Sequence, residues 1–164
     1  MVTNLKMNIM DVSTKMKPTL FATLGLPGSG KSTWAKKMCA FENMDDKLSG
    51  SVMIRAIETT KDDIREELHG GVWSKENEKI VVQTQTNRIK SALTFGVNVY
   101  VHDTNFAQYD RLNAIAKECD ADIVWVDFTQ VPIEECIRRD SLRDGKKRVG
   151  EAVIRKIAAQ AKII

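Results

Sequence analysis

The feature that most constrains this chain is a glycine-rich segment placed between an apolar run and a helix-forming stretch. Residues 25–32 read GLPGSGKS, which matches the pattern G-x-x-x-x-G-K-[ST] in full. The apolar run at residues 19–26 predicts a buried strand, and residues 31–40 predict a helix. A chance match in a glycine-rich turn is the alternative, but the strand before and the helix after provide the context that a phosphate-binding loop requires.

Each residue of this loop has an expected task. The glycines let the backbone curl so that its N–H groups face phosphates, and the N-terminus of the following helix adds its dipole. Lys31 is expected to reach the β- and γ-phosphates of a nucleotide, Ser32 to ligate Mg²⁺ and Thr33 to contact the α-phosphate. Trp34 is expected in the core. The predicted nucleotide-binding residues of the loop are Gly28, Ser29, Gly30, Lys31, Ser32 and Thr33.

The composition is that of one globular domain. The chain has 164 residues and a net charge of +3, which alone does not indicate a nucleic-acid partner. Its three cysteines are odd in number and widely spaced, which argues against a disulfide framework and fits a reducing cytoplasm. No apolar stretch approaches the ~20 residues of a membrane span, so no membrane association is expected. We predict a loosely ordered leader at residues 1–17 and one domain, which carries the phosphate-binding loop, at residues 18–164.

Strand-like and helix-like segments alternate along the chain. This order predicts an α/β fold of the P-loop NTPase kind, with a small parallel sheet covered by helices on both faces. Functional residues should then collect at the carboxyl ends of the strands. The predicted strands span residues 19–26, 52–60, 97–102 and 123–128, and the predicted helices span residues 31–40, 61–69, 76–95, 107–119, 132–142 and 149–162.

The second predicted strand is followed by the residues KDDIR at positions 61–65. One aspartate is expected to cap the following helix, and the other to face the γ-phosphate, where a carboxylate can accept the proton of an attacking hydroxyl. Arg65 lies three residues after Asp62, so the two side chains point the same way on a helix. An arginine there is well placed to hold a phosphate of the acceptor, and a plain surface ion pair is the alternative.

The third predicted strand is followed by HDTN at positions 102–105. Asp103 at the end of an apolar strand is similar to the acidic residue that holds Mg²⁺ directly or through water in P-loop proteins. An Asx turn is the alternative, but Thr104 and Asn105 could cap the next helix and leave Asp103 free. His102 is expected to alternate onto the other face of the sheet and to be structural.

A basic segment at residues 138–148 follows the last predicted strand and joins two helices. It holds six basic and two acidic residues, and small P-loop kinases place a lid at this point of the chain. Arg139 and Arg143 are four residues apart and share one helical face, as a phosphate clamp requires. A closing lid excludes water and favours transfer over hydrolysis, whereas the alternative is a solvated charged face.

Four motifs in this order, GLPGSGKSTWA, KDDIR, HDTN and RRDSLRDG, resemble the kinase domain of the bacteriophage polynucleotide kinase–phosphatase family. The resemblance runs from about Pro18 to the C-terminus, some nine-tenths of the chain. It implies a phage-like nucleic-acid repair enzyme that phosphorylates 5′-hydroxyl ends of DNA or RNA with ATP and Mg²⁺. The expected location is the cytoplasm, which is that of the host if the chain comes from a phage. The oligomeric state stays open, with a homo-oligomer as one option.

The resemblance also implies roles for individual residues. Lys31 and Ser32 would be the catalytic residues of the loop, and Asp62 would be the general base. Arg65 would bind the 3′-phosphate of the acceptor, and Asp103 would organise the acceptor site.

Two arginines of the basic segment receive roles by the same resemblance. Arg139 and Arg143 would be the lid arginines that bind the nucleotide, and Arg143 would also act in catalysis. The chain departs from the family pattern at Lys61, where an arginine usually precedes the base, and in the altered length of residues 144–148.

Two other functions remain open at this stage. One is a P-loop kinase for a small acceptor such as a sugar acid, an antibiotic or a nucleotide sugar, as in the zeta-type toxins. The other is a module that hydrolyses or senses ATP, which predicts no acceptor site and leaves Asp62 and Arg65 unexplained. The Asn-Lys-x-Asp signature of a typical GTPase is absent, and 164 residues are few for a ring-forming ATPase.

Overall fold

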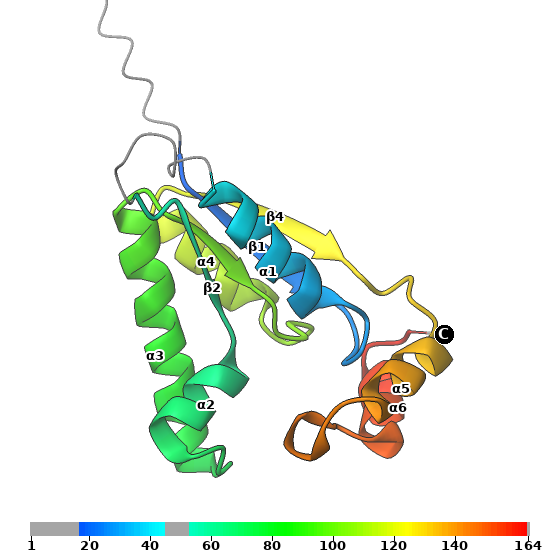
Figure 1. Cartoon of the computed structure of the whole chain (residues 1–164). Coiled ribbons are helices and arrows are strands. Elements are labelled where there is room, and N and C mark those ends of the chain that lie inside the picture. Colours follow the sequence, from blue (N-terminus) through cyan, green and yellow to red (C-terminus); the bar gives the residue numbers. More distant parts are fainter. Residues whose placement is uncertain (1–16, 45–52, 164) are drawn as a thin grey trace, which may run out of the picture.

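The computed structural model describes residues 17–44 and 53–163 and shows a four-stranded sheet (Figure 1). All strand pairs are parallel, and the strand order is β2-β3-β1-β4. The predicted leader, except for Lys17, lies outside the described residues. The strands are β1 (Thr19–Leu24), β2 (Ala56–Thr59), β3 (Asn98–Val101) and β4 (Asp122–Asp127).

The six predicted helices are all present, with ends that differ by up to two residues. They are α1 (Lys31–Glu42), α2 (Lys61–His69), α3 (Lys75–Thr94), α4 (Tyr109–Glu118), α5 (Ile133–Ser141) and α6 (Glu151–Gln160). A short 3₁₀ helix, η2 (Gly145–Lys147), which the sequence analysis did not predict, lies between α5 and α6. The alternating pattern of the sequence therefore predicted the α/β class correctly.

The second strand is shorter than predicted: residues 53–55 are not part of it, although the carbonyl of Arg55 accepts a hydrogen bond of 2.8 Å from the N–H of Asn98 in β3. The side chain of Asn43, just after α1, accepts hydrogen bonds from the N–H groups of Arg55 and Ala56 and donates one to the carbonyl of Ala56. A side chain that takes these backbone groups competes with strand pairing at this point. Residue 52 lies outside the described part of the chain.

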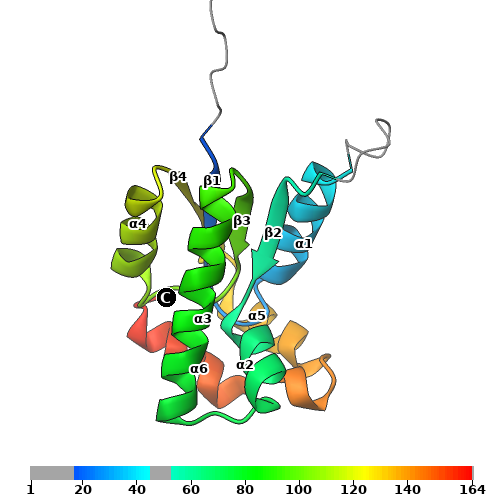
Figure 2. The same ribbon diagram turned by 90° about the vertical axis from the view of Figure 1, so that its left-hand side faces the viewer.

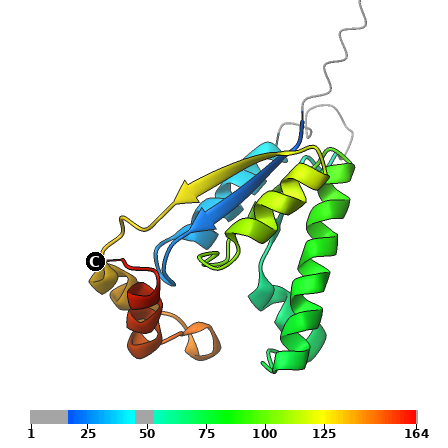
Figure 3. The same cartoon turned by 180° about the vertical axis from the view of Figure 1, so that it is seen from behind.

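Each face of the sheet is covered by helices, as predicted (Figures 2 and 3). On one face, α3 and α4 pack on alternate residues of β1 and β3, with Leu20, Val99 and Val101 fully buried. On the other face, α1 packs through Ala35 against Tyr100. The period of two along β3 therefore sends Val101 toward α3 and α4 and the next side chain, that of His102, toward α1.

Helices α5 and α6 form a hairpin at the carboxyl edge of the sheet, below the loop that follows β1 (Figures 1 and 3). The hairpin has its own small core, in which Leu26 of that loop packs with Cys136, Ile154 and Ala158. On the other side of the loop, α2 and the first half of α3 also extend beyond the sheet edge (Figure 1). The glycine-rich loop thus lies between two helical projections.

Within the described residues, no helix combines the length and apolar character that crossing a membrane requires. All three cysteines are free thiols, as their spacing predicted.

Candidate active site

The glycine-rich loop has the backbone that phosphate binding requires. Gly28 and Gly30 have φ angles of +86° and +105°, a region that side chains with a Cβ rarely adopt. Gly30 is the N-cap of α1, and among the described residues no side chain caps this helix. The first N–H groups of α1 are therefore available to an anion at the positive end of the helix dipole.

Gly28 also fixes how closely the hairpin approaches the loop. A Cβ atom built on Gly28 would lie 2.3 Å from the backbone carbonyl oxygen of Cys136 in α5. Only a residue without a side chain permits this contact, because backbone atoms cannot swing away as a flexible side chain can. The loop and α5 are consequently held as one packed unit.

We expect Gly28→Ala to lower stability and to abolish nucleotide binding, because the methyl group forces α5 away from the loop. Gly96→Ala is the matched control, since Gly96 has a φ of +76° but nothing within 4 Å of an added Cβ. The control should lose only the ~1–2 kcal/mol that a left-handed backbone costs. Denaturant unfolding and nucleotide titration of both variants measure this difference, and equal stability losses with intact binding in both would contradict it.

Lys31 is buried within the loop. Its ammonium group donates to the carbonyl of Leu26 at 2.7 Å and lies 3.4 Å from the hydroxyl of Ser29. The pKa of Lys31 is lowered to about 8, chiefly by burial, with a smaller contribution from the charge of Arg143. Cys136 and the carboxylates of Asp103 and Asp62 act in the opposite direction. A buried cation of this kind gains most from an anion placed beside it.

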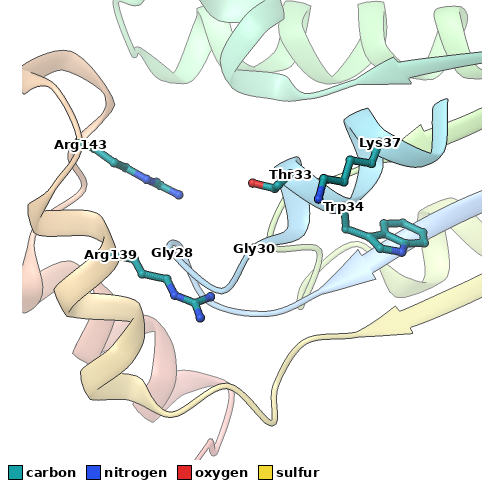
Figure 4. Close-up of a pocket in the computed structure, with 7 residues that line it drawn as sticks. All are labelled: Gly28, Gly30, Thr33, Trp34, Lys37, Arg139 and Arg143. Carbon is teal, nitrogen blue, oxygen red and sulfur yellow. The ribbon is translucent and has the colours of Figure 1, made fainter. Parts of the chain in front are cut away.

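A cavity of about 550 Å³ opens between the loop, α1 and α5 (Figure 4). Arg139 and Arg143 project into it from the hairpin, opposite Thr33 and Lys37 of α1 (Figure 4). Lys37 was not among the predicted residues. Trp34, predicted as core, does pack against the sheet in edge-to-face contact with Phe21 and Tyr100, but it also lines the cavity. The lining residues are Gly28, Gly30, Thr33, Trp34, Lys37, Arg139 and Arg143.

Both predicted lid arginines are oriented by carboxylates of α5. The Nε of Arg139 donates to Glu135 at 2.6 Å, and the Nη1 of Arg143 lies 3.4 Å from Asp140. The buried carboxylate of Asp140 also accepts the N–H groups of Val149 and Gly150, which ties the start of α6 to the end of α5. This bond explains why α6 begins at Glu151 and not at Val149 as predicted.

The carboxyl end of β2 places Asp62 and Arg65 side by side. Thr60 caps α2 by accepting the N–H of Asp63, so the prediction that one aspartate of the pair is the cap is wrong. Asp62 is 86% exposed, and its carboxylate accepts a hydrogen bond of 2.7 Å from Arg65. Within the described part of the chain, the carboxylate of Asp63 has no hydrogen-bond partner.

Arg65 is anchored by a residue that the sequence analysis missed. Glu78 of α3 accepts hydrogen bonds from Nε and Nη2 of Arg65 at 3.1 and 2.8 Å, and its other oxygen lies 3.9 Å from the ammonium group of Lys61. Three of the five N–H groups of Arg65 therefore donate to carboxylates, and the other two have no partner among the described residues. Glu78 is distant in sequence, and no spacing rule connects it to Arg65.

Asp103 is not free, contrary to the prediction. Its two carboxylate oxygens accept the N–H of Lys61 at 3.0 Å and the side-chain amide of Gln85 at 2.7 Å. Burial raises the pKa of Asp103, and these hydrogen bonds act against that rise. Thr104 and Asn105 do not cap α4; the Asn105 amide instead donates to the carbonyls of Thr23 and Val101 and joins the ends of β1 and β3.

A chain of buried polar groups continues behind Asp103. The Gln85 oxygen accepts a hydrogen bond of 2.8 Å from Arg111, which also donates to Thr86 and Gln108. Since Asp103 only accepts and Arg111 only donates, the orientation of the Gln85 amide is determined. In the sequence Gln85 only weakened the apolar pattern of α3, and nothing there indicated this contact.

His102 contacts the loop, although it was expected to be structural. The alternation of β3 does carry it to the α1 face, but Ser32 lies on that face, and its hydroxyl oxygen is 3.1 Å from Nδ1 of His102. The other ring nitrogen lies 3.0 Å from the carboxylate of Glu58 in β2. Sequence reasoning located the face but had no information on where the first turn of α1 would fall.

The residues present fit a magnesium nucleotide. The uncapped start of α1, the buried Lys31 ammonium and the two hairpin arginines suit a polyphosphate. The described residues contain no cluster of three His, Cys, Asp or Glu side chains able to hold a metal ion. Mg²⁺ commonly takes few protein ligands and binds chiefly through phosphates and water, so a site with few protein ligands is compatible with a magnesium nucleotide.

Comparison with known families agrees with this geometry. Residues 20–163 match the family AAA_33, described as an AAA domain. The chain belongs to this AAA domain family. With the parallel sheet and the loop after β1, it has the α/β fold of a P-loop NTPase, as the sequence predicted.

Solved structures show the same fold. A chain of the Pnkp1/Rnl/Hen1 RNA repair complex matches with a TM-score of 0.72 at 23% identity, over 88% of this chain and 44% of that chain. The APS kinase CysC of Mycobacterium tuberculosis matches at 0.55 and 20% identity, over 77% and 70% of the two chains. A gluconokinase of Sinorhizobium meliloti matches at 0.50 and 16% identity, over 85% and 73%.

At these identities the likeness concerns the fold, which is that of a P-loop kinase. The resemblance to the polynucleotide kinase domain is therefore confirmed at the level of the fold. This chain spans less than half the length of the RNA repair chains that it matches, 44% and 38% in two structures.

Proposed function

We propose that this chain transfers the γ-phosphate of ATP to the 5′-hydroxyl group at an end of DNA or RNA. The observation that carries the proposal is the hydrogen-bonded Asp62–Arg65–Glu78 group, which lies at the same edge of the sheet as the phosphate loop (Figure 1). An exposed carboxylate close to the phosphates can take the proton of an attacking hydroxyl. The arginine beside it, anchored by Glu78, can present its remaining N–H groups to a phosphate of the acceptor.

On the donor side, the loop and the hairpin would bind ATP. Lys31 would neutralise charge on the β- and γ-phosphates, Thr33 would contact the α-phosphate, and Ser32 would hold Mg²⁺, which offsets phosphate charge when bound. Arg139 and Arg143 would bind the nucleotide from the opposite wall of the cavity, and Arg143 would also stabilise the charge that develops during transfer. The backbone N–H groups of Gly28 and Gly30 would complete this donor site, whereas the N–H of Ser29, also predicted to bind the nucleotide, already donates to the carbonyl of Leu26 at 3.1 Å.

On the acceptor side, Asp62 would be the general base and Arg65 would bind the phosphate 3′ to the attacking nucleoside. Asp103 would organise the site by holding the N–H of Lys61 and with it the first turn of α2, in which Asp62 lies. Both oxygens of Asp103 already accept hydrogen bonds, which favours this role over the predicted contact with Mg²⁺, direct or through water.

The second candidate is a kinase for a small acidic acceptor. The likeness in fold to an APS kinase and a gluconokinase supports it, and Arg65 would then bind the anionic group of that acceptor. The Pnkp1/Rnl/Hen1 structure, a complex for RNA repair, favours nucleic-acid ends instead. A module that only hydrolyses or senses ATP binds no acceptor and so leaves the Asp62–Arg65–Glu78 group unexplained. We therefore rank this function last.

We expect the parent protein to prefer a nucleoside 3′-monophosphate over the free nucleoside, and Arg65→Ala to lose this preference. A charge-assisted hydrogen bond is worth ~1.5–3 kcal/mol, so kcat/KM should differ roughly ten- to a hundredfold in the parent. Arg88→Ala is the control, because Arg88 is an arginine of α3 that pairs with Glu67. Equal discrimination in the parent and in Arg65→Ala would show that the acceptor phosphate is held elsewhere.

A further inference from the structure

Three elements of the fold meet at one buried side chain. His102, at the end of β3, has 2% of its side chain exposed and lies between Glu58 of β2 and Ser32 of α1. Its Nε2 is 3.0 Å from the Glu58 carboxylate, and its Nδ1 is 3.1 Å from the Ser32 hydroxyl oxygen. No role described above requires this contact.

The chemistry of the three groups decides where the protons lie. A carboxylate only accepts hydrogen bonds, so the ring nitrogen that faces Glu58 carries the proton. In a neutral imidazole the other nitrogen then has only a lone pair and must accept. Among the described residues, the donor that lies within hydrogen-bond distance of it is the hydroxyl of Ser32.

This direction matters for what Ser32 can do. A serine hydroxyl is a rotor with one proton and two lone pairs, and a metal ion needs a lone pair. When the proton is held by His102 on one side, the lone pairs of the Ser32 oxygen are left for the other side. The histidine thus prepares the oxygen before any ion arrives, as a hydrogen-bonding partner behind a metal ligand does.

We propose that His102, oriented by Glu58, is a positioning residue that accepts the Ser32 hydroxyl proton and so directs the Ser32 oxygen toward the Mg²⁺ of the bound nucleotide. The proposal rests on the proposed function only in that Ser32 holds this ion. It does not depend on which acceptor the enzyme uses.

The test compares nucleotide affinity with and without metal. A fluorescent ATP analogue is titrated in Mg²⁺ and in EDTA. The readout is the ratio of the dissociation constant in EDTA to that in Mg²⁺, which measures how much the metal strengthens binding. His102→Leu fills the buried site with an apolar side chain that cannot accept a hydrogen bond from Ser32. We expect this variant to lower the ratio about ten- to a hundredfold. Affinity in EDTA should change little. His102→Asn, whose amide oxygen can accept near the position of Nδ1, should recover part of the ratio.

Tyr100→Phe is the matched control for packing. Tyr100 lies two residues earlier on the same face of β3, and its hydroxyl group forms a hydrogen bond with Glu42. Removing this hydroxyl group changes a buried contact of the sheet and leaves the contact between His102 and Ser32 in place. We expect this variant to keep the parental ratio. A His102→Leu protein that keeps the parental ratio, or that loses affinity equally in Mg²⁺ and EDTA, would overturn the proposal and leave His102 a structural residue.

The ring tautomer gives a second, independent readout. The chain has two histidines, so long-range ¹H–¹⁵N spectra of the parent and of His69→Gln assign the His102 ring. We expect the proton on Nε2, and a proton on Nδ1 would overturn the proposal. Failure of transfer to oligonucleotides with the Mg²⁺ ratio and the tautomer as expected would contradict the proposed function but not this inference.

Discussion

Lys31→Ala should abolish phosphoryl transfer and leave the fold intact. The Lys31 ammonium is buried in the loop next to where the phosphates would lie, with a pKa lowered to about 8 by burial. Removing a buried group that stabilises developing charge costs at least ~10²-fold in kcat. Because the side chain is a costly buried cation that forms no ion pair within residues 17–44 and 53–163, its loss should not lower the free energy of unfolding.

Lys36→Ala is the matched control, since Lys36 is an exposed lysine of the same helix. Initial rates of label transfer from ATP, together with denaturant unfolding curves, measure both variants. If Lys31→Ala retains turnover within tenfold of the parent, the donor site has been assigned to the wrong loop.

Asp62→Asn should lower kcat by ~10²–10⁴-fold, the usual contribution of a general base. The amide is nearly the same size and can still contact Arg65, but it accepts no proton from an attacking hydroxyl. Since Asp62 lies on α2 and not on the phosphate loop, the dissociation constant for ATP should change much less than kcat.

The neighbouring carboxylate provides the comparison for this prediction. Asp63→Asn makes the same chemical change one residue further along α2, where the side chain is also exposed. Steady-state kinetics with a 5′-hydroxyl oligonucleotide separate the two variants. A large effect of Asp63→Asn with a small effect of Asp62→Asn would mean that the base is the other member of the pair.

The sequence was sufficient for the α/β class and for nearly all helices and strands because their signals are local. The strand at residues 19–26, the loop glycines and the break at Gly96 each act on their immediate neighbours. The predicted starts of β2 and α6 were wrong, and at both places a side chain from elsewhere in the sequence forms hydrogen bonds with the backbone. Asn43 binds the start of β2, and Asp140 holds the N–H groups before α6.

The site was predicted only as far as it follows strand ends. The phosphate loop and the motifs KDDIR and HDTN each follow a strand, and in a parallel sheet the ends of these strands lie at one edge. Asp62, Arg65 and Asp103 could therefore be placed at this edge from the sequence. Glu78, Gln85 and Glu58 could not, because they lie within α3 and β2 and not in a segment that follows a strand. Their contacts depend on how helices pack on the sheet, which no motif spacing encodes.

The central claim is transfer to a 5′-hydroxyl end, and one competition experiment tests it. Radiolabelled ATP and Mg²⁺ are supplied with an equimolar mixture of a 5′-hydroxyl oligonucleotide, the same oligonucleotide bearing a 5′-phosphate, APS and gluconate. We expect label on the 5′-hydroxyl oligonucleotide alone, and its loss in Asp62→Asn. Label on APS or gluconate, or release of inorganic phosphate with no labelled acceptor, would contradict the account.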